Sequence, residues 1–243
     1  MNLLEWVPKS PETFLSDVQA VFKAVPAVSG INIPDILRLP TRSYQAAKVL
    51  LDHNIWVVPH IRACDQSPSA TCDLIGQLVD AGLTHALIVQ GDVKTETPPQ
   101  GTTLETLNAL RKSFPNLTLY AALDPYRSSF EAEIDYAHQK LQAGANGIFT
   151  QPFFDLKLAS QYLKALDHTQ VFLGISPVTT ERSKTYWETQ NKVRFPAQFQ
   201  LDLDANIQLA KDLVGLAKNA NQHTYMMPIT HPELEFSKSV LGE

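Results

Sequence analysis

Residues 55–89, IWVVPHIRACDQSPSATCDLIGQLVDAGLTHALIV, carry the pattern that decides the fold. The apolar run at 55–59 is rich in β-branched residues and predicts a strand. The amphipathic stretch at 69–81 predicts a helix that Gly82 closes, and residues 85–89 predict the next strand. A strand, a helix and a second strand in this order form a unit in which two parallel strands are joined by a right-handed crossover.

The same alternation continues in both directions along the 243 residues. Further strands are expected at 3–7, 28–33, 117–122, 147–150, 171–175 and 224–227. Further helices are expected at 11–24 with Ser10 as N-cap, and at 43–52, 103–113, 129–143, 156–167, 181–190, 204–219 and 232–241. Eight strands without a linker between them predict one domain over 1–243, a closed (β/α)8 TIM barrel. An open doubly wound sheet is the alternative, and it is disfavoured because no G-x-G-x-x-G turn follows the first strand.

The charge and composition exclude several classes of partner. With 25 acidic and 20 basic residues the net charge is −5, so nucleic acid is not expected as a partner. The sequence contains no apolar run of about 20 residues and no apolar signal core near its start, so we expect a cytoplasmic protein without membrane contact. Cys64 and Cys72 fit no zinc or redox motif, and no metal site is expected.

The active site of such a barrel lies in the loops at the carboxyl ends of its strands. The polar residues expected there come from several strands or their loops: Glu5, Asp35, His60, Arg62, Asp92, Asp124, Gln151 and Asp155. Polar loops are common, so each of these residues alone is a weak indication. Glu5 is a sharper one, because it interrupts the apolar strand LLEWV, where an inward carboxylate is costly unless it is used or paired.

Several stretches resemble one enzyme family. Residues 143–155, AGANGIFTQPFFD, resemble the AGA-x-x-x-x-TQ-x-FFD segment of methylenetetrahydrofolate reductases. Weaker matches follow the family's order: LEWVP at 4–8, VPHI at 58–61, GD at 91–92, and GISPV through VRFP at 174–196. The resemblance covers nearly the whole chain, and its specific part is the T-Q-x-F-F-D segment.

The resemblance implies an oxidoreductase of one-carbon metabolism and methionine biosynthesis. In the family, NADH or NADPH gives hydride to bound FAD, and the reduced flavoprotein converts 5,10-methylenetetrahydrofolate to 5-methyltetrahydrofolate. The methylene bridge must first open to an iminium, which needs a proton on N10 of the folate. Glu5 stands where the family keeps its general acid, and burial of a carboxylic acid can raise its pKa enough to retain a proton near neutral pH.

The resemblance also implies roles for other residues. Asp92 matches a catalytic aspartate near the pterin and flavin rings. Further cofactor contacts are matched by His60, Glu133 and Lys140. Substrate contacts are matched by Gln151, Trp187 and Tyr225. From residue type alone, position 140 could equally be a solvated helix lysine and position 187 a barrel-packing tryptophan. Barrels of the family generally associate, so a homo-oligomer is implied.

The departures from the family pattern concentrate on the flavin. Gln90 replaces the arginine before Gly-Asp, Leu123 replaces a tyrosine on the fifth strand, and Pro34 stands at the position matched to a flavin-binding threonine. One hypothesis is a reductase with a modified FAD pocket, in which Arg62 or Arg127 supplies the missing cation.

Two further hypotheses stay open. A flavin-independent reductase would pass hydride directly from NADH to the folate. A folate-binding barrel would serve tetrahydrofolate-dependent methyl transfer or demethylation without flavin. A remote alternative is an aldolase-type barrel with Lys94 as its Schiff-base lysine.

Overall fold

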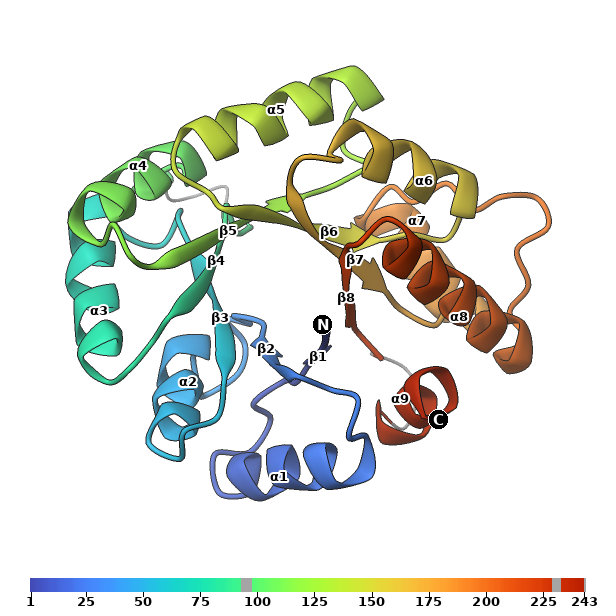
Figure 1. The fold of residues 1–243 in the computed structure, drawn as a ribbon, viewed down its shortest axis with the longest axis horizontal. Helices are drawn as coiled ribbons and strands as arrows, with labels where there is room; N and C mark the ends of the chain where they lie inside the picture. Colours follow the sequence, from blue (N-terminus) through green and yellow to red (C-terminus); the bar gives the residue numbers. More distant parts are fainter. Residues whose placement is uncertain (93–97, 229–232, 243) are drawn as a thin grey trace.

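Eight parallel strands close into a barrel in the computed structural model, which describes residues 1–92, 98–228 and 233–242 (Figure 1). The strands are β1 (Asn2–Glu5), β2 (Gly30–Ile33), β3 (Val57–Arg62), β4 (His85–Val89), β5 (Thr118–Leu123), β6 (Gly147–Pro152), β7 (Gln170–Ile175) and β8 (His223–Met226). Each strand pairs with its neighbours in the chain, and β8 pairs with β1. The predicted TIM-barrel class is therefore confirmed.

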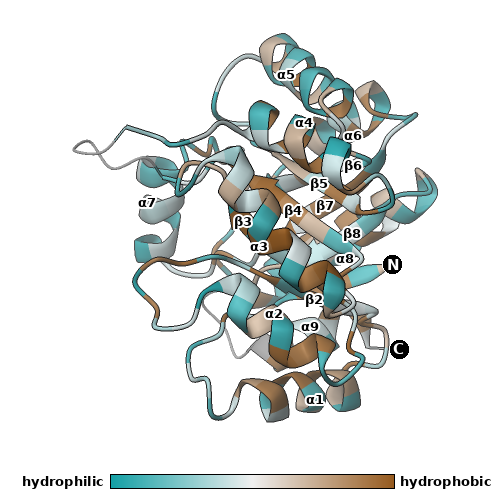
Figure 2. Ribbon diagram, turned by 90° about the vertical axis from the view of Figure 1, so that its left-hand side faces the viewer, coloured by the Kyte–Doolittle hydropathy of each residue, from teal (hydrophilic) through white to brown (hydrophobic). Residues whose placement is uncertain are grey.

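Helices follow the strands and lie outside their ring (Figure 1). They are α1 (Phe14–Ala24), α2 (Ser43–Leu51), α3 (Pro68–Asp80), α4 (Thr103–Ser113), α5 (Phe130–Gln142), α6 (Leu156–Ala165), α7 (Glu181–Gln190), α8 (Leu203–Asn219) and α9 (Glu233–Leu241). The apolar residues are concentrated on the strands, as the brown colour of β4 in the centre of Figure 2 shows. Both faces of the strands are thus covered, by helices outside and by side chains inside.

The two-residue period of the strands separates two layers of core. Outward residues such as Ile31, Ile88 and Ile148 belong to the large cluster that includes the helices. The inward residues form a second cluster that is rich in aromatic rings. The ring centre of Phe149 lies 4.3 Å from that of Phe172 and 5.1 Å from that of Tyr225. These rings fill the centre of the barrel, so inward residues nearer the carboxyl ends of the strands face its mouth.

Three predicted boundaries, the ends of β3 and β6 and the start of α1, were wrong, and the differences change which residues lie on these elements. Strand β3 runs on to Arg62 instead of ending at Pro59, because residues 60–62 pair with β4. Strand β6 runs on to Pro152 through an irregular register with β7, which makes Gln151 a strand residue. Helix α1 begins at Phe14 after a turn, and the predicted N-cap Ser10 instead donates a hydrogen bond to Glu12.

Gly30 is needed at the amino end of β2 because a ring occupies the space beside it. A Cβ atom on Gly30 would lie 1.9 Å from Cε3 of Trp56. The indole cannot move away freely, since its Nε1 donates a hydrogen bond to Nδ1 of His85 at 2.9 Å. The absence of a side chain therefore lets Trp56 close this end of the barrel.

We predict that Gly30→Ala lowers the free energy of unfolding by about 1–3 kcal/mol, the usual cost of overpacking a core. Gly215→Ala is the matched control, because Gly215 lies within α8 and a Cβ there would meet nothing within 4 Å. That variant should be neutral or gain up to about 1 kcal/mol from helix propensity. Denaturant unfolding of both variants measures the difference, and equal stabilities would contradict the packing described for Trp56.

Candidate active site at the barrel mouth

Three polar side chains from β1, β2 and β3 meet at the mouth of the barrel. The register pairs Glu5 with Asn32, and Asn32 with Val58, two residues before His60. Nδ2 of Asn32 donates to Oε2 of Glu5 at 3.4 Å, and Oδ1 of Asn32 lies 2.5 Å from Nε2 of His60. The structure therefore brings together the predicted residues Glu5 and His60 through a third residue, Asn32.

The environment of Glu5 favours the neutral acid. Its side chain keeps some contact with solvent but is surrounded by the walls of the barrel, and this desolvation raises its pKa to about 8. No cation among the described residues pairs with its carboxyl group. At neutral pH Glu5 therefore holds a proton that it can give to a bound molecule.

His60 is shifted in the opposite sense by the same cause. Burial lowers its pKa to about 4, and the charge of Asp35 opposes this shift only in part. The imidazole is therefore neutral at pH 7, and it acts as a hydrogen-bonding group, not as a cation.

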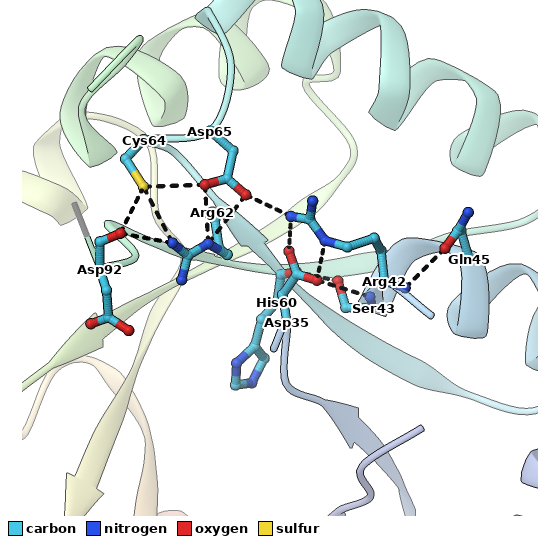
Figure 3. Close-up of polar contacts among 9 residues, drawn as sticks. All are labelled: Asp35, Arg42, Ser43, Gln45, His60, Arg62, Cys64, Asp65 and Asp92. Carbon is cyan, nitrogen blue, oxygen red and sulfur yellow. Dashed lines mark hydrogen bonds and ion pairs between the residues drawn. The ribbon is translucent and has the colours of Figure 1, made fainter. Parts of the chain in front are cut away.

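Asp92 lies in the loop after β4, where Arg62 holds its backbone. Nη2 of Arg62 donates to the carbonyl oxygen of Asp92 at 2.9 Å, and Nε of Arg62 bonds Asp65. Figure 3 shows the Asp92 carboxylate pointing away from this network, and the side chain is exposed. Asp92 thus presents its carboxylate to solvent on a backbone that is fixed from β3.

The Arg62 network continues to α2 (Figure 3). Arg42 pairs with Asp65 at 2.6 Å and with Asp35, which follows β2, at 2.5 Å. Asp35 also accepts a hydrogen bond from the backbone N–H of Ser43 at the start of α2. Asp35 and Arg62 were both expected at strand ends, and the structure places them there as ties between the loops after β2, β3 and β4.

A second group of polar residues lies beside the ends of β5 and β6. Glu133 is buried, and its carboxylate accepts hydrogen bonds from Arg127 at 2.8 and 2.7 Å and from Ser128. Lys140 is also a buried residue, and its Nζ donates to the carbonyl oxygen of Ala122 and lies 3.9 Å from the ring centre of Tyr136. Lys140 is therefore not a solvated helix lysine.

Lys140 and Gln151 line the same small pocket, of about 60 Å³. Desolvation, followed by the nearby charge of Arg127, lowers the pKa of Lys140 to about 8. Desolvation is also the main cause of a raised pKa at Asp124 on the same pocket. The predicted residues Glu133, Lys140 and Gln151 are thus close together, although Glu133 and Lys140 are already satisfied within the protein.

Two predicted substrate contacts lie in packed surroundings. The hydroxyl of Tyr225 donates to the carbonyl oxygen of Thr150, and Tyr225 is only 5% exposed. Trp187 on α7 is 4% exposed, and its ring centre lies 5.4 Å from that of Phe154. The barrel-packing alternative for position 187 thus has structural support, while the predicted contact of Trp187 with a folate stays a prediction.

Sequence reasoning missed Asn32 and assigned Asp155 to the mouth. Asn32 carries the same signal that singled out Glu5, a polar residue inside an apolar strand, here GINI. Asp155 instead caps α6, because its carboxylate accepts hydrogen bonds from the backbone N–H groups of Lys157 and Leu158. The aldolase candidate Lys94 lies outside the described residues.

Neither a metal-ligand cluster nor a membrane-spanning helix is found among the described residues. Within them, no group of three or more His, Cys, Asp and Glu residues could hold a metal ion. No helix in this part of the chain is both long and apolar enough to cross a membrane.

These features define a (β/α)8 barrel with a proton-holding carboxyl group at its mouth. The chain belongs to the methylenetetrahydrofolate reductase family, because the model of that family matches residues 18–224. The 5,10-methylenetetrahydrofolate reductase of Pectobacterium carotovorum subsp. carotovorum is 25% identical over 149 residues, which are 57% of this chain and 49% of the relative. That of Escherichia coli (strain K12) is 23% identical over 165 residues, 64% of this chain and 56% of the relative. The chain thus spans about half the length of the curated relatives it matches.

Solved structures with the same fold are more distant in sequence. A 2,3-dimethylmalate lyase of the PEP mutase/isocitrate lyase superfamily has a TM-score of 0.63 at 10% identity, over 95% of this chain and 76% of that one. Yersinia pestis DHPS with a pterine-sulfa conjugate has a TM-score of 0.54 at 14% identity, over 99% of this chain and 91% of that one. At such identities the likeness supports the fold alone.

The raised pKa of Glu5 predicts how stability depends on pH. The folded protein retains the Glu5 proton up to about pH 8, whereas the unfolded chain releases it near 4.5. Between these values the folded state binds more protons, so stability is fully present below pH 4.5 and falls as the pH rises, by up to about 1.4 kcal/mol per pH unit.

Glu5→Gln removes this titration. We therefore expect the variant to gain stability relative to the native protein as the pH rises from about 4.5 to about 8. Denaturant unfolding at several pH values measures the difference. A constant difference across this range would mean that Glu5 ionises in the folded protein as it does in water.

Proposed function

We propose that this protein reduces 5,10-methylenetetrahydrofolate to 5-methyltetrahydrofolate in the cytoplasm, with NADH or NADPH as the source of hydride. The observation that carries the proposal is a neutral carboxylic acid, Glu5, at the mouth of a barrel of this family. A protein that only bound folate would have no use for a buried proton donor at that position. The retained Glu5, Asp92 and Gln151 support the same conclusion.

The reaction requires a proton for N10 of the folate and a hydride for the methylene carbon. Glu5 gives its proton to N10 of the folate, the bond from N10 to the methylene carbon breaks, and an iminium forms at N5. Hydride then reaches the methylene carbon and completes the methyl group. Glu5, left as a carboxylate, takes a proton from solvent before the next turnover.

We propose that Asp92 faces the pterin ring, where its exposed carboxylate favours the cationic iminium, and that Gln151, Trp187 and Tyr225 line the folate site.

FAD is the hydride carrier that the family implies, and the described residues fit it poorly. Lys140 and Glu133, matched to flavin contacts, bond Ala122 and Arg127 instead. The amide of Gln90, where the family has arginine, is bonded to the backbone of Gly101 and Thr103. Each cation near the β5 end is therefore engaged within the described part of the protein, and Leu123 there is apolar.

These contacts favour a reaction without flavin. In that reaction His60 would not contact a flavin and would act only as a hydrogen-bonding group at the mouth. Hydride would pass from the reduced nicotinamide to the methylene carbon in one step. A reductase that binds FAD is the second candidate, supported by the family membership.

We predict that Glu5→Gln lowers kcat for folate reduction by at least about 100-fold, because a general acid contributes about 10²–10⁴ to rate. Binding of the folate, measured by equilibrium titration, should be largely unchanged, since glutamine has nearly the same shape. Glu131→Gln, at an exposed position on α5, is the control and should retain native activity. Equal loss of turnover in both variants, or full activity of Glu5→Gln, would contradict the role of Glu5.

An absorbance spectrum distinguishes the two routes of hydride. After incubation with FAD and desalting, we expect no flavin bands at roughly 370 and 450 nm, where the free cofactor absorbs. NADH or NADPH should then be consumed when methylenetetrahydrofolate is added to the colourless protein. Retained flavin that NADH bleaches and the folate reoxidises would instead establish the FAD route.

A further inference from the structure

A buried asparagine connects two titratable side chains of the mouth, Glu5 and His60. Asn32 is 0% exposed, and its amide lies between His60, at 2.5 Å from Oδ1, and Glu5, at 3.4 Å from Nδ2. A buried amide within an apolar strand costs free energy unless both of its ends are hydrogen-bonded. Desolvation shifts the pKa of both partners, upward at Glu5 and downward at His60.

The direction of each hydrogen bond follows from the chemistry of the amide. An amide oxygen only accepts, so Nε2 of His60 must carry its ring hydrogen. An amide nitrogen only donates, so Oε2 of Glu5 must accept. In a neutral carboxylic acid the accepting oxygen is the carbonyl oxygen, which leaves the proton on Oε1.

We propose that Asn32 is a positioning residue that fixes the Glu5 proton on the oxygen facing the substrate, and that His60 in turn holds Asn32. This inference rests on the proposed function of Glu5 as acid. In the step itself, the O–H bond at Oε1 breaks as an N–H bond forms at N10 of the folate. The electron pair of the broken C–N10 bond remains on N10.

The reversed amide would defeat this arrangement. Oδ1 of Asn32 would then face Glu5 and accept its proton, while Nδ2 would donate to an unprotonated Nε2 of His60. The acid proton would be turned into the protein and away from the substrate. The tautomer of His60 therefore reports which arrangement exists, and it can be measured in the native protein.

The first test is ¹⁵N NMR of the native protein labelled at histidine, with His60→Gln to assign the signals. At pH 7 we expect Nε2 of His60 to be protonated and Nδ1 to be unprotonated. A ring protonated at Nδ1 alone would overturn the inference, because Asn32 would then have to point its oxygen at Glu5.

The second test uses the carbonyl stretching band of the protonated Glu5 in infrared spectra, assigned by its absence in Glu5→Gln. Asn32→Leu removes the amide at similar volume, and we expect this band to move to higher wavenumber as its hydrogen bond is lost. An unmoved band would overturn the inference. His60→Leu should move the band as well if Asn32→Leu does not fold, and His60→Gln, which keeps an N–H donor, should move it less.

Turnover provides the third test. A misdirected proton costs about 10- to 100-fold in rate, so we expect Asn32→Leu to lower kcat by this amount with KM little changed, and His60→Gln to retain more activity than His60→Leu. A native kcat in Asn32→Leu would overturn the inference. A native protein that reduces no folate would overturn the proposed function instead, while the NMR and infrared results would still decide the orientation of Asn32.

Discussion

The two-residue period of a strand within a closed ring constrains everything else in this molecule. Once β1–β8 pair around the barrel, every second side chain must face the inside. Aromatic rings fill the centre of that space, with ring centres from 4.3 Å apart (Phe149 and Phe172) to 5.2 Å apart (Tyr120 and Phe172). Polar residues two positions after these inward core residues, nearer the carboxyl ends of the strands, therefore line the mouth. Closure of the barrel desolvates Glu5 and His60. Desolvation raises the pKa of Glu5 and lowers that of His60, so both side chains are neutral at pH 7.

Among the described residues, the cations around the mouth pair with carboxylates other than Glu5. The ion pairs of Arg42 and Arg62 tie the loops after β2, β3 and β4, and Arg127 neutralises Glu133 beside β5. These pairs lie around the rim, where they hold backbone in place without offering Glu5 a cation. A carboxyl group that has an amide for a partner, and no cation among the described residues, keeps its proton, which is what a general acid requires.

The sequence was sufficient for the class of fold and for much of the site. Regular alternation of apolar and amphipathic runs predicted the barrel, and the bounds of β4, α4 and α7 agree with the prediction. Glu5 was found because a charge inside an apolar strand is rare, and Asn32 could have been found by the same signal. The pairing of Lys140 with Ala122 and the burial of Trp187 depend on tertiary packing that no local pattern encodes. The extension of β6 through Gln151 to Pro152 depends likewise on its register with β7.

The proposed reaction depends on Glu5 being a neutral acid in the folded protein at physiological pH. ¹³C NMR of glutamate carboxyl carbons, with Glu5→Gln to assign the resonance, follows its ionisation directly. We expect a titration midpoint near 8. A midpoint near 4.5 would show that Glu5 is ionised at pH 7 and could not supply the proton on which the proposed reaction depends.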